Sequence, residues 1–112
     1  MSDLAAKRCK PCEGGIEPLS AEASRRLLLE LDHWDLDPSC KEISKLFNFR
    51  NYHETIAFVN AAAWIAHGED HHPDLEVGYN LCRVRYSTHA IGGLSENDFI
   101  CAAKVDGLLG RA

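Results

Sequence analysis

One segment of the sequence, residues 51–68, predicts a long helix that is apolar on almost every side. Asn51 stands at its start and Glu54 follows three residues later, which is the spacing of a helix N-cap and its reciprocal partner. The apolar residues inside it are Ile56, Phe58, Val59, Ala61, Ala62, Ala63, Trp64, Ile65 and Ala66. A helix without a polar face has to be buried in a domain or packed against another subunit. Gly68 weakens this helix, and Pro73 disfavours helical backbone at the residue before it, so we expect extended chain there.

The residues before this helix alternate in the manner of β-strands. In residues 42–49, three apolar side chains share one face at a period of two, and Lys45 interrupts that face. These apolar residues are Ile43, Phe47 and Phe49. Trp34 and Leu36 alternate with acidic residues ahead of a turn over residues 37–39. The two pieces predict a β-hairpin or two neighbouring strands.

A second pair of strands is predicted after the helix. Residues 75–77 and 81–88 flank a turn over residues 78–80. In the later strand, alternate residues divide between an apolar face and a face that carries Arg83 and Arg85. The apolar face consists of Cys82, Val84 and Tyr86.

Amphipathic helices are expected at both ends of this core. Ser20 is a candidate N-cap for a helix near residues 20–32, and Ser95 with Asp98 has the spacing of a capping box for a closing helix that Gly110 can end. Their apolar or small faces comprise Ser24, Leu27, Leu28 and Leu31 in the first helix, and Phe99, Ala102, Ala103 and Leu109 in the last. The predicted order is therefore α-β-β-α-β-β-α. This order favours an α+β fold, with an antiparallel four-stranded sheet and three helices on one face.

The ends and the charge of the chain restrict its domains and partners. Residues 1–18 end in GGIEP and predict a flexible lead-in to a single domain over residues 19–112. The formal net charge of -5 argues against a broad surface for nucleic acid or an anionic membrane. No apolar run approaches the roughly 20 residues that cross a bilayer, and the N-terminus lacks the apolar region of a secretory signal. We therefore expect a cytoplasmic protein.

The five cysteines predict free thiols, because an odd number without an export signal is typical of a reducing compartment. Cys9 and Cys12 form a CxxC motif, but no second close pair of Cys or His residues completes a zinc site. The motif lies in the predicted lead-in, not between a strand and a helix as in thioredoxin-type proteins. We therefore expect it to be dispensable.

The histidines are the candidate functional residues. His33 and His53 occupy polar positions, and we assign them no function. Four others could converge, because three bracket the end of the long helix and the fourth follows the last strand. These four are His67, His71, His72 and His89. We expect histidines at such positions to contribute little to core packing.

Three interpretations of this cluster are open. His67 and His71 are four residues apart, and with a third histidine they could bind zinc, although Gly68 lies within the spacing. Alternatively, the imidazoles transfer protons near neutral pH, with Asp70 or Asp74 orienting one of them. The third interpretation is a surface loop without function. No serine or cysteine stands out as an activated nucleophile, so the second interpretation favours addition or elimination by acid/base catalysis.

The sequence resembles the pterin-4a-carbinolamine dehydratase family over roughly residues 20 to 110. The family pattern is a polar residue, His-His-Pro, an aromatic residue, a histidine and an aspartate at fixed spacings. Here it is met by His67, His71, His72, Pro73, Tyr79, His89 and Asp98. The phrases THxxxGLSxxD, from Thr88, and KxFxF, from Lys45, are also typical of the family. Two positions differ: His67 replaces a frequent glutamate, and Leu75 replaces a common aromatic residue.

The resemblance implies an enzyme that dehydrates 4a-hydroxy-tetrahydropterin to quinonoid dihydropterin without a metal or cofactor, recycling pterin for aromatic amino-acid hydroxylases. It implies a catalytic trio of His71, His72 and His89, with the pterin also lined by Asp70, Ser87, Thr88 and Ala90. It further implies a homodimer or homotetramer, and a hydroxylase is a possible partner. A pterin-binding protein without turnover and a dimerisation partner of a transcription factor are the alternatives, and a turnover assay separates them from the enzyme.

Overall fold

Helices and strands follow one another in the predicted order α-β-β-α-β-β-α in a computed structural model that describes residues 3–11 and 16–109. The helices are α1 (Ala21–Leu28), α2 (Tyr52–Glu69) and α3 (Glu96–Gly107). The strands are β1 (Asp35–Leu36), β2 (Ile43–Asn48), β3 (Asp74–Val77) and β4 (Leu81–Tyr86). Two short 3-10 helices are added, η1 (Leu4–Ala6) and η2 (His89–Ile91).

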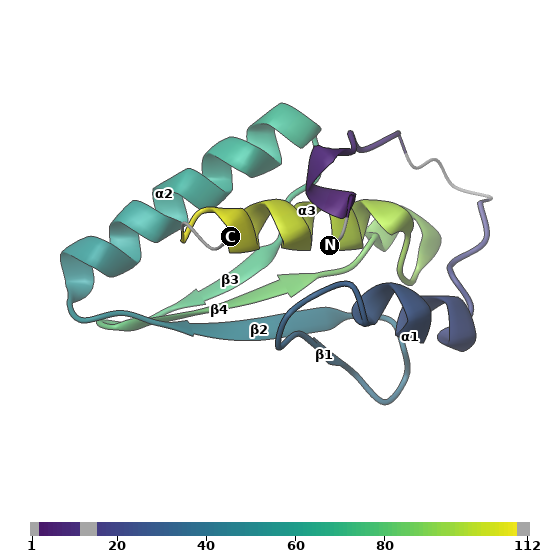
Figure 1. Cartoon of the computed structure of the whole chain (residues 1–112), viewed down its shortest axis with the longest axis horizontal. Helices are drawn as coiled ribbons and strands as arrows, with labels where there is room; N and C mark the ends of the chain where they lie inside the picture. Colours follow the sequence, from purple (N-terminus) through teal and green to yellow (C-terminus); the bar gives the residue numbers. More distant parts are fainter. Residues whose placement is uncertain (1–2, 12–15, 110–112) are drawn as a thin grey trace.

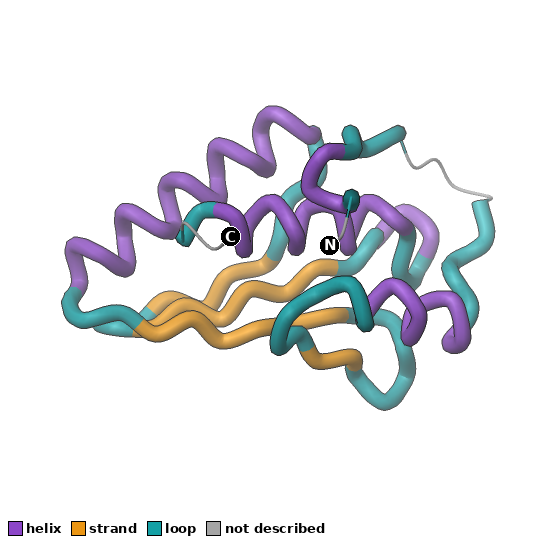
Figure 2. The backbone as a smooth tube through the Cα atoms, viewed as in Figure 1, coloured by secondary structure: helices purple, strands orange, loops and turns teal. Residues whose placement is uncertain are grey.

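The strands form one antiparallel sheet in the order β1-β2-β4-β3, and the helices cover one of its faces (Figures 1 and 2). The alternation predicted for β4 is confirmed, because its apolar residues Cys82, Val84 and Tyr86 are fully buried. Arg85 is on the other face, where it forms ion pairs with Glu42 and Glu76. The α+β architecture predicted from the sequence is therefore confirmed.

Lys45 interrupts the apolar face of β2 because it reaches toward α3. Its Nζ lies 2.9 Å from a carboxylate oxygen of Asp106 and 5.0 Å from the centre of the Phe47 ring. Trp34 donates its indole N–H to the other Asp106 oxygen at 3.0 Å. One carboxylate of α3 thus holds both an ammonium from β2 and an indole that precedes β1.

Helix α2 begins as predicted but ends later. The Asn51 side chain accepts the Glu54 N–H at 2.9 Å, whereas the Glu54 carboxylate accepts from the N–H of Arg50 and not from that of Asn51. The helix continues through Gly68 and stops at Asp70, whose left-handed φ of 53° lets the Asp70 and His71 N–H groups bond carbonyls of the last turn. This ending directs the following residues across the N-terminal part of α3. The other helices end earlier than predicted, α1 at Leu28 and α3 at Gly107, while Gly110 lies outside the described residues.

Residues 3–11 of the predicted lead-in lie against α3 on the side away from the sheet (Figure 1). Leu4 is 1% exposed and joins the core, and Lys104 donates to the Ala5 carbonyl at 2.8 Å. This stretch is therefore packed on the domain, although its flexibility stays a prediction. Within the described residues, no helix is both long and apolar enough to cross a membrane.

Candidate active site

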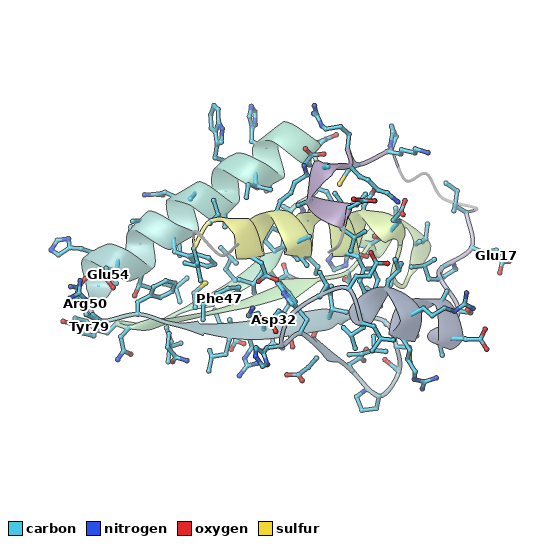
Figure 3. The ribbon with its side chains drawn as sticks, in the orientation of Figure 1. Glu17, Asp32, Phe47, Arg50, Glu54 and Tyr79 are labelled. Carbon is cyan, nitrogen blue, oxygen red and sulfur yellow. The ribbon has the colours of Figure 1, made fainter. Side chains whose placement is uncertain are left out.

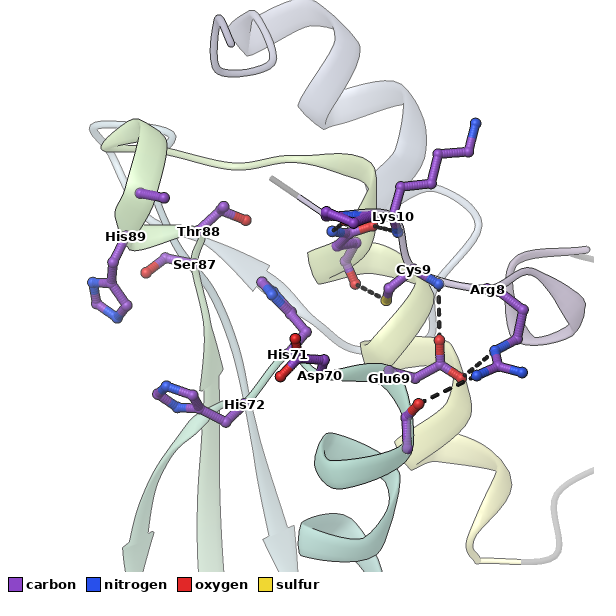
Figure 4. A pocket seen from close by; sticks show the side chains of 14 residues that line it. Arg8, Cys9, Lys10, Glu69, Asp70, His71, His72, Ser87, Thr88 and His89 are labelled. Carbon is purple, nitrogen blue, oxygen red and sulfur yellow. Dashed lines mark hydrogen bonds and ion pairs between the residues drawn. The ribbon is translucent and has the colours of Figure 1, made fainter. Parts of the chain in front are cut away.

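A cavity of about 500 Å³ opens where α2, β4, the start of α3 and residues 8–11 meet. A volume of this size falls in the range of small-molecule sites. Every site residue implied by the resemblance lines it, namely Asp70, His71, His72, Ser87, Thr88, His89 and Ala90. Figure 4 shows the side chains around this cavity. The remaining lining residues are Arg8, Cys9, Lys10, Pro11, Gly68, Glu69 and Asn97.

His71 is the buried imidazole of the site. Its Nε2 lies 2.6 Å from Oδ1 of Asp98, and the two side chains are 12% and 0% exposed, respectively. The other Asp98 oxygen accepts the Thr88 hydroxyl at 2.8 Å and the Ser95 N–H at 3.0 Å. A carboxylate held in this way fixes the orientation of the imidazole and selects which ring nitrogen faces the carboxylate.

Tyr86 supports the same imidazole from the sheet. The His71 and Tyr86 rings are parallel within 8°, and their centroids are 5.9 Å apart. Burial raises the pKa of the Tyr86 hydroxyl far above its usual range, so this group stays neutral and carries no charge into the site. His71 thus contacts both a buried carboxylate and a buried ring, and the expectation that it contributes little to packing is wrong.

His72 and His89 are the exposed imidazoles of the cavity. The His89 side chain is 69% exposed, and its Nε2 is 3.8 Å from an Asp74 carboxylate oxygen. His72 is also exposed, with Nδ1 3.3 Å from the carbonyl of Pro73. Both rings are accessible to a ligand that enters the cavity, whereas His71 lies in its wall (Figure 4).

The carboxylate that orients His71 is not one of the two considered from the sequence. Asp70 lines the cavity as an exposed residue after α2, and Asp74 lies near His89 instead. Asp98 takes this role, although the sequence identified it as a helix cap and as the last residue of the family pattern. It performs both tasks, because its side chain also accepts the Ser95 N–H in the capping box of α3.

Some residues of the family pattern, and the variant position 75, lie away from this cavity. His67 is exposed on α2, where its ring lies 6.0 Å from that of Trp64, so it does not join the other histidines. Tyr79 stacks on Tyr52 with ring centroids 6.4 Å apart, at the opposite end of α2 near Arg50 and Glu54 (Figure 3). Leu75 is half-buried against the core.

The N-terminal wall of the cavity, residues 8–11, escaped sequence reasoning. Glu69, only 9% exposed, accepts the Cys9 N–H at 2.8 Å and pairs with Arg8 at 3.0 Å. The bond from Cys9 is the main reason that the pKa of Glu69 is lowered. Asn97 exchanges two hydrogen bonds with the Lys10 backbone, at 3.0 and 2.6 Å. These contacts join residues at least 60 positions apart, so no short-range sequence pattern predicts them.

Replacing Glu69 by alanine is expected to release this N-terminal wall. The change removes the acceptor of the Cys9 N–H, and a hydrogen bond to a charged group contributes about 1.5–3 kcal/mol. It also removes the partner of Arg8, but that side chain is 74% exposed, so this ion pair adds less than about 1 kcal/mol. Opening of the segment, and therefore trypsin cleavage after Arg8, should become roughly tenfold or more faster. The control is Glu22→Ala, which removes an exposed acid paired with Arg26 on α1 and should leave the cleavage rate unchanged. Equal rates in parent and Glu69→Ala would contradict the attachment.

The described residues contain no group of three or more His, Cys, Asp or Glu side chains placed to hold a metal ion. His67 lies apart from the other histidines, so the three-ligand arrangement with His67 and His71 is not formed by these positions. The imidazoles that line the cavity, His71, His72 and His89, can transfer protons and form hydrogen bonds.

Comparison with known proteins places the whole fold among pterin dehydratases. The family model described as pterin 4 alpha carbinolamine dehydratase matches residues 17–108. Curated relatives named after that enzyme include proteins of Nitrosomonas eutropha, 63% identical over 96% of this chain and 94% of the relative, and of Legionella pneumophila, 54% identical over 96% of both chains.

Two solved structures share the fold. A crystal structure described as a transcriptional coactivator/pterin dehydratase from Brucella melitensis has a TM-score of 0.78 at 28% identity, covering 82% of this chain and 98% of that one. A pterin dehydratase-like protein described as a RuBisCO assembly factor of the alpha-carboxysome has a TM-score of 0.62 at 24% identity, covering 72% and 94%. At that identity the second structure shows similarity of fold alone. By the match over residues 17–108 and the identity to its curated relatives, the chain belongs to the pterin 4 alpha carbinolamine dehydratase family.

Proposed function

We propose that this chain dehydrates a 4a-hydroxy-tetrahydropterin to the quinonoid dihydropterin by histidine acid/base catalysis. The observation that carries the proposal is the imidazole of His71, held by the fully buried carboxylate of Asp98 in a cavity that also presents His72 and His89. Family membership supplies the substrate class, and the cavity supplies groups that can move protons. The reaction needs both a proton for the leaving 4a-hydroxyl and removal of the proton from N5.

The geometry supports a division of these two tasks. If Nε2 of His71 donates to Asp98, the other ring nitrogen, Nδ1, is left without a proton and can accept one from N5. The imidazolium formed is then stabilised by Asp98, as in other carboxylate–histidine pairs. His89, exposed and solvated, is the group that we propose protonates the leaving hydroxyl. His72 is proposed to position the bicycle.

The remaining lining residues are proposed to bind the pterin. Asp70, Ser87 and Ala90 line the cavity and are exposed or half-buried. Thr88 differs, because its side chain is 4% exposed and its hydroxyl is bonded to Asp98 and Ser95. The Thr88 N–H also donates to the Gly93 carbonyl at 2.8 Å. We therefore propose that Thr88 holds the carboxylate of the pair and contributes to pterin binding by shaping the wall of the cavity.

The test is turnover of 4a-hydroxy-tetrahydropterin by the purified chain, followed by absorbance as the quinonoid product forms. Turnover well above the spontaneous rate, unchanged after treatment with a chelator, is the expected result. Binding of the pterin without acceleration would instead show a non-catalytic pterin-binding protein. Stoichiometric zinc whose removal abolished turnover would overturn acid/base catalysis without a metal. We propose an aromatic amino-acid hydroxylase as the partner. A role in recycling would appear as faster steady-state turnover of that hydroxylase when this protein is added. The cytoplasmic location stays a prediction.

Self-association through α2 is also proposed. This helix buries Thr55, Phe58 and Ala62 in the domain, whereas Trp64 is 75% exposed on its outer side. A large aromatic side chain that is mostly exposed on a helix is typical of an interface between subunits. Sedimentation at micromolar concentration is expected to give a homodimer or homotetramer, and Trp64→Lys should shift it toward the 12.5 kDa monomer. Leu29→Lys, at an 85% exposed position of the first helix's end, is the control that should leave the assembly intact. A monomer for the parent chain would refute the proposal.

A further inference from the structure

Two cysteine sulfurs meet behind the N-terminal wall of the cavity. The Sγ atoms of Cys9 and Cys101 are 3.5 Å apart, although the residues are 92 positions apart in the sequence. Cys101 is fully buried in α3, while Cys9 is half-buried and lines the cavity. Cys9 of the CxxC motif therefore pairs with the thiol of Cys101, and the spacing of the motif does not predict this pair. The family model begins at residue 17, so this thiol lies outside the stretch that the family model matches.

We propose that Cys9 and Cys101 form a reversible disulfide, made by a hydroperoxide, which ties residues 8–11 covalently to α3. A disulfide requires an S–S separation of about 2.05 Å, so the sulfurs must approach by about 1.5 Å. The movement falls mainly on Cys9, because residues 7–11 contain no helix or strand whereas Cys101 lies within α3.

The order of the two chemical steps follows from the surroundings of each thiol. The adjacent Cys9 side chain and burial raise the pKa of the Cys101 thiol far above its usual range, so Cys101 is not the group that attacks the oxidant. The Cys9 thiolate attacks the O–O bond, takes one oxygen as a sulfenic acid and releases water, or an alcohol from an organic hydroperoxide. The Cys101 sulfur then attacks the Cys9 sulfur. The hydroxyl group leaves with the Cys101 proton as a second water, so two thiols supply two electrons and two protons to one hydroperoxide.

Oxidation would change the site in two ways. The N-terminal wall, attached in the reduced protein by hydrogen bonds to Glu69 and Asn97, would become covalently fixed to α3. In addition, the Cys101 thiol would lose the proton that it can donate to the carbonyl of His71, 3.9 Å away. Formation of the Cys9–Cys101 disulfide would thus alter both the N-terminal wall of the cavity and the hydrogen bonding of the His71 carbonyl.

The experiment uses the full chain carrying Cys12→Ser, so that Cys9 has no partner within its own motif. After treatment with hydrogen peroxide, the remaining thiols are alkylated and the chain is cut at Lys and Arg, which places Cys101 alone in the peptide of residues 86–104. Mass spectrometry without reductant should find this peptide joined to the one that contains Cys9, and dithiothreitol should separate them. Hydrogen exchange at the amides of Cys9 and Lys10 should slow by about tenfold or more in the oxidised form.

Two variants make the result specific. Cys82→Ala removes another buried cysteine, on β4, and should leave the linkage intact, whereas Cys9→Ser should abolish it. Failure of the folded Cys12→Ser chain to form the Cys9–Cys101 linkage would overturn the proposal, and so would a linkage that forms only after the chain is unfolded in urea. The linkage is read from peptides and not from turnover, so its presence or absence is independent of the proposed dehydratase activity.

Discussion

Replacing His71 by glutamine together with His89 by alanine is expected to lower kcat for dehydration by roughly 10⁴-fold or more, while each single change costs roughly 10–10³-fold. Either imidazole can partly serve for the other, because solvent and the remaining ring still reach the pterin. The double variant loses both routes, so its effect should exceed that of either single change and need not equal their product. Initial rates at saturating pterin would measure this.

Glutamine is chosen at position 71 because alanine would also leave the buried Asp98 carboxylate without its imidazole partner. The glutamine amide can still donate to Asp98, so the change tests proton transfer with less effect on folding. His53→Ala, an exposed histidine at the far end of α2, is the control and should keep the parental rate. His72→Ala should raise KM more than it lowers kcat, as expected for a positioning group. A folded double variant with parental turnover would remove the histidines from the mechanism.

The fold could be predicted because its layers depend on local patterns. The two-residue period of β2 and β4 and the capped start of α2 follow from steric and hydrogen-bonding preferences of short segments. The exception, Lys45, is explained by partners outside its own strand: the Asp32 carbonyl and Asp106 on α3, which lies 61 positions later in the chain. The end of α2 was misplaced because an aspartate, not the glycine two residues before it, adopts the left-handed conformation.

The site was predicted in part for a similar reason. The adjacent histidines follow a helix end and precede a proline, and this local pattern can be recognised in the sequence. The pairing of His71 with Asp98, by contrast, depends on how the chain after α2 packs against the start of α3. The two residues are 27 positions apart in the sequence. The wall formed by residues 8–11 depends on still longer contacts, anchored by one buried residue, Leu4. A mostly polar segment that contacts the core through Leu4 and Cys9 has no periodicity from which its packing could be predicted.

Replacing Asp98 by alanine is expected to cost about 3–5 kcal/mol of unfolding free energy, the largest loss of stability that we expect from a single change in the site. The side chain is 0% exposed and accepts from Thr88, Ser95 and His71. Its removal leaves these buried or half-buried donors without their acceptor, and it also removes the capping box of α3. Urea denaturation followed by circular dichroism would measure the loss.

Asp98→Asn separates the structural role from the role in catalysis. The amide keeps the shape and one acceptor oxygen, which can still receive the Ser95 N–H, so about half of the stability loss should be recovered. It cannot compensate a positive charge on His71, so turnover should stay low even where the variant is fully folded. The matched control is Glu96→Ala. Glu96 lies in the same turn of α3 as Asp98 and is a half-exposed acid paired with Lys7, so its removal should change the unfolding free energy and the turnover little. If Asp98→Ala unfolded at the urea concentration of the parent, the buried carboxylate would not organise the site. If Asp98→Asn turned over at the parental rate, the charge on Asp98 would have no part in the proton transfer that we assign to His71.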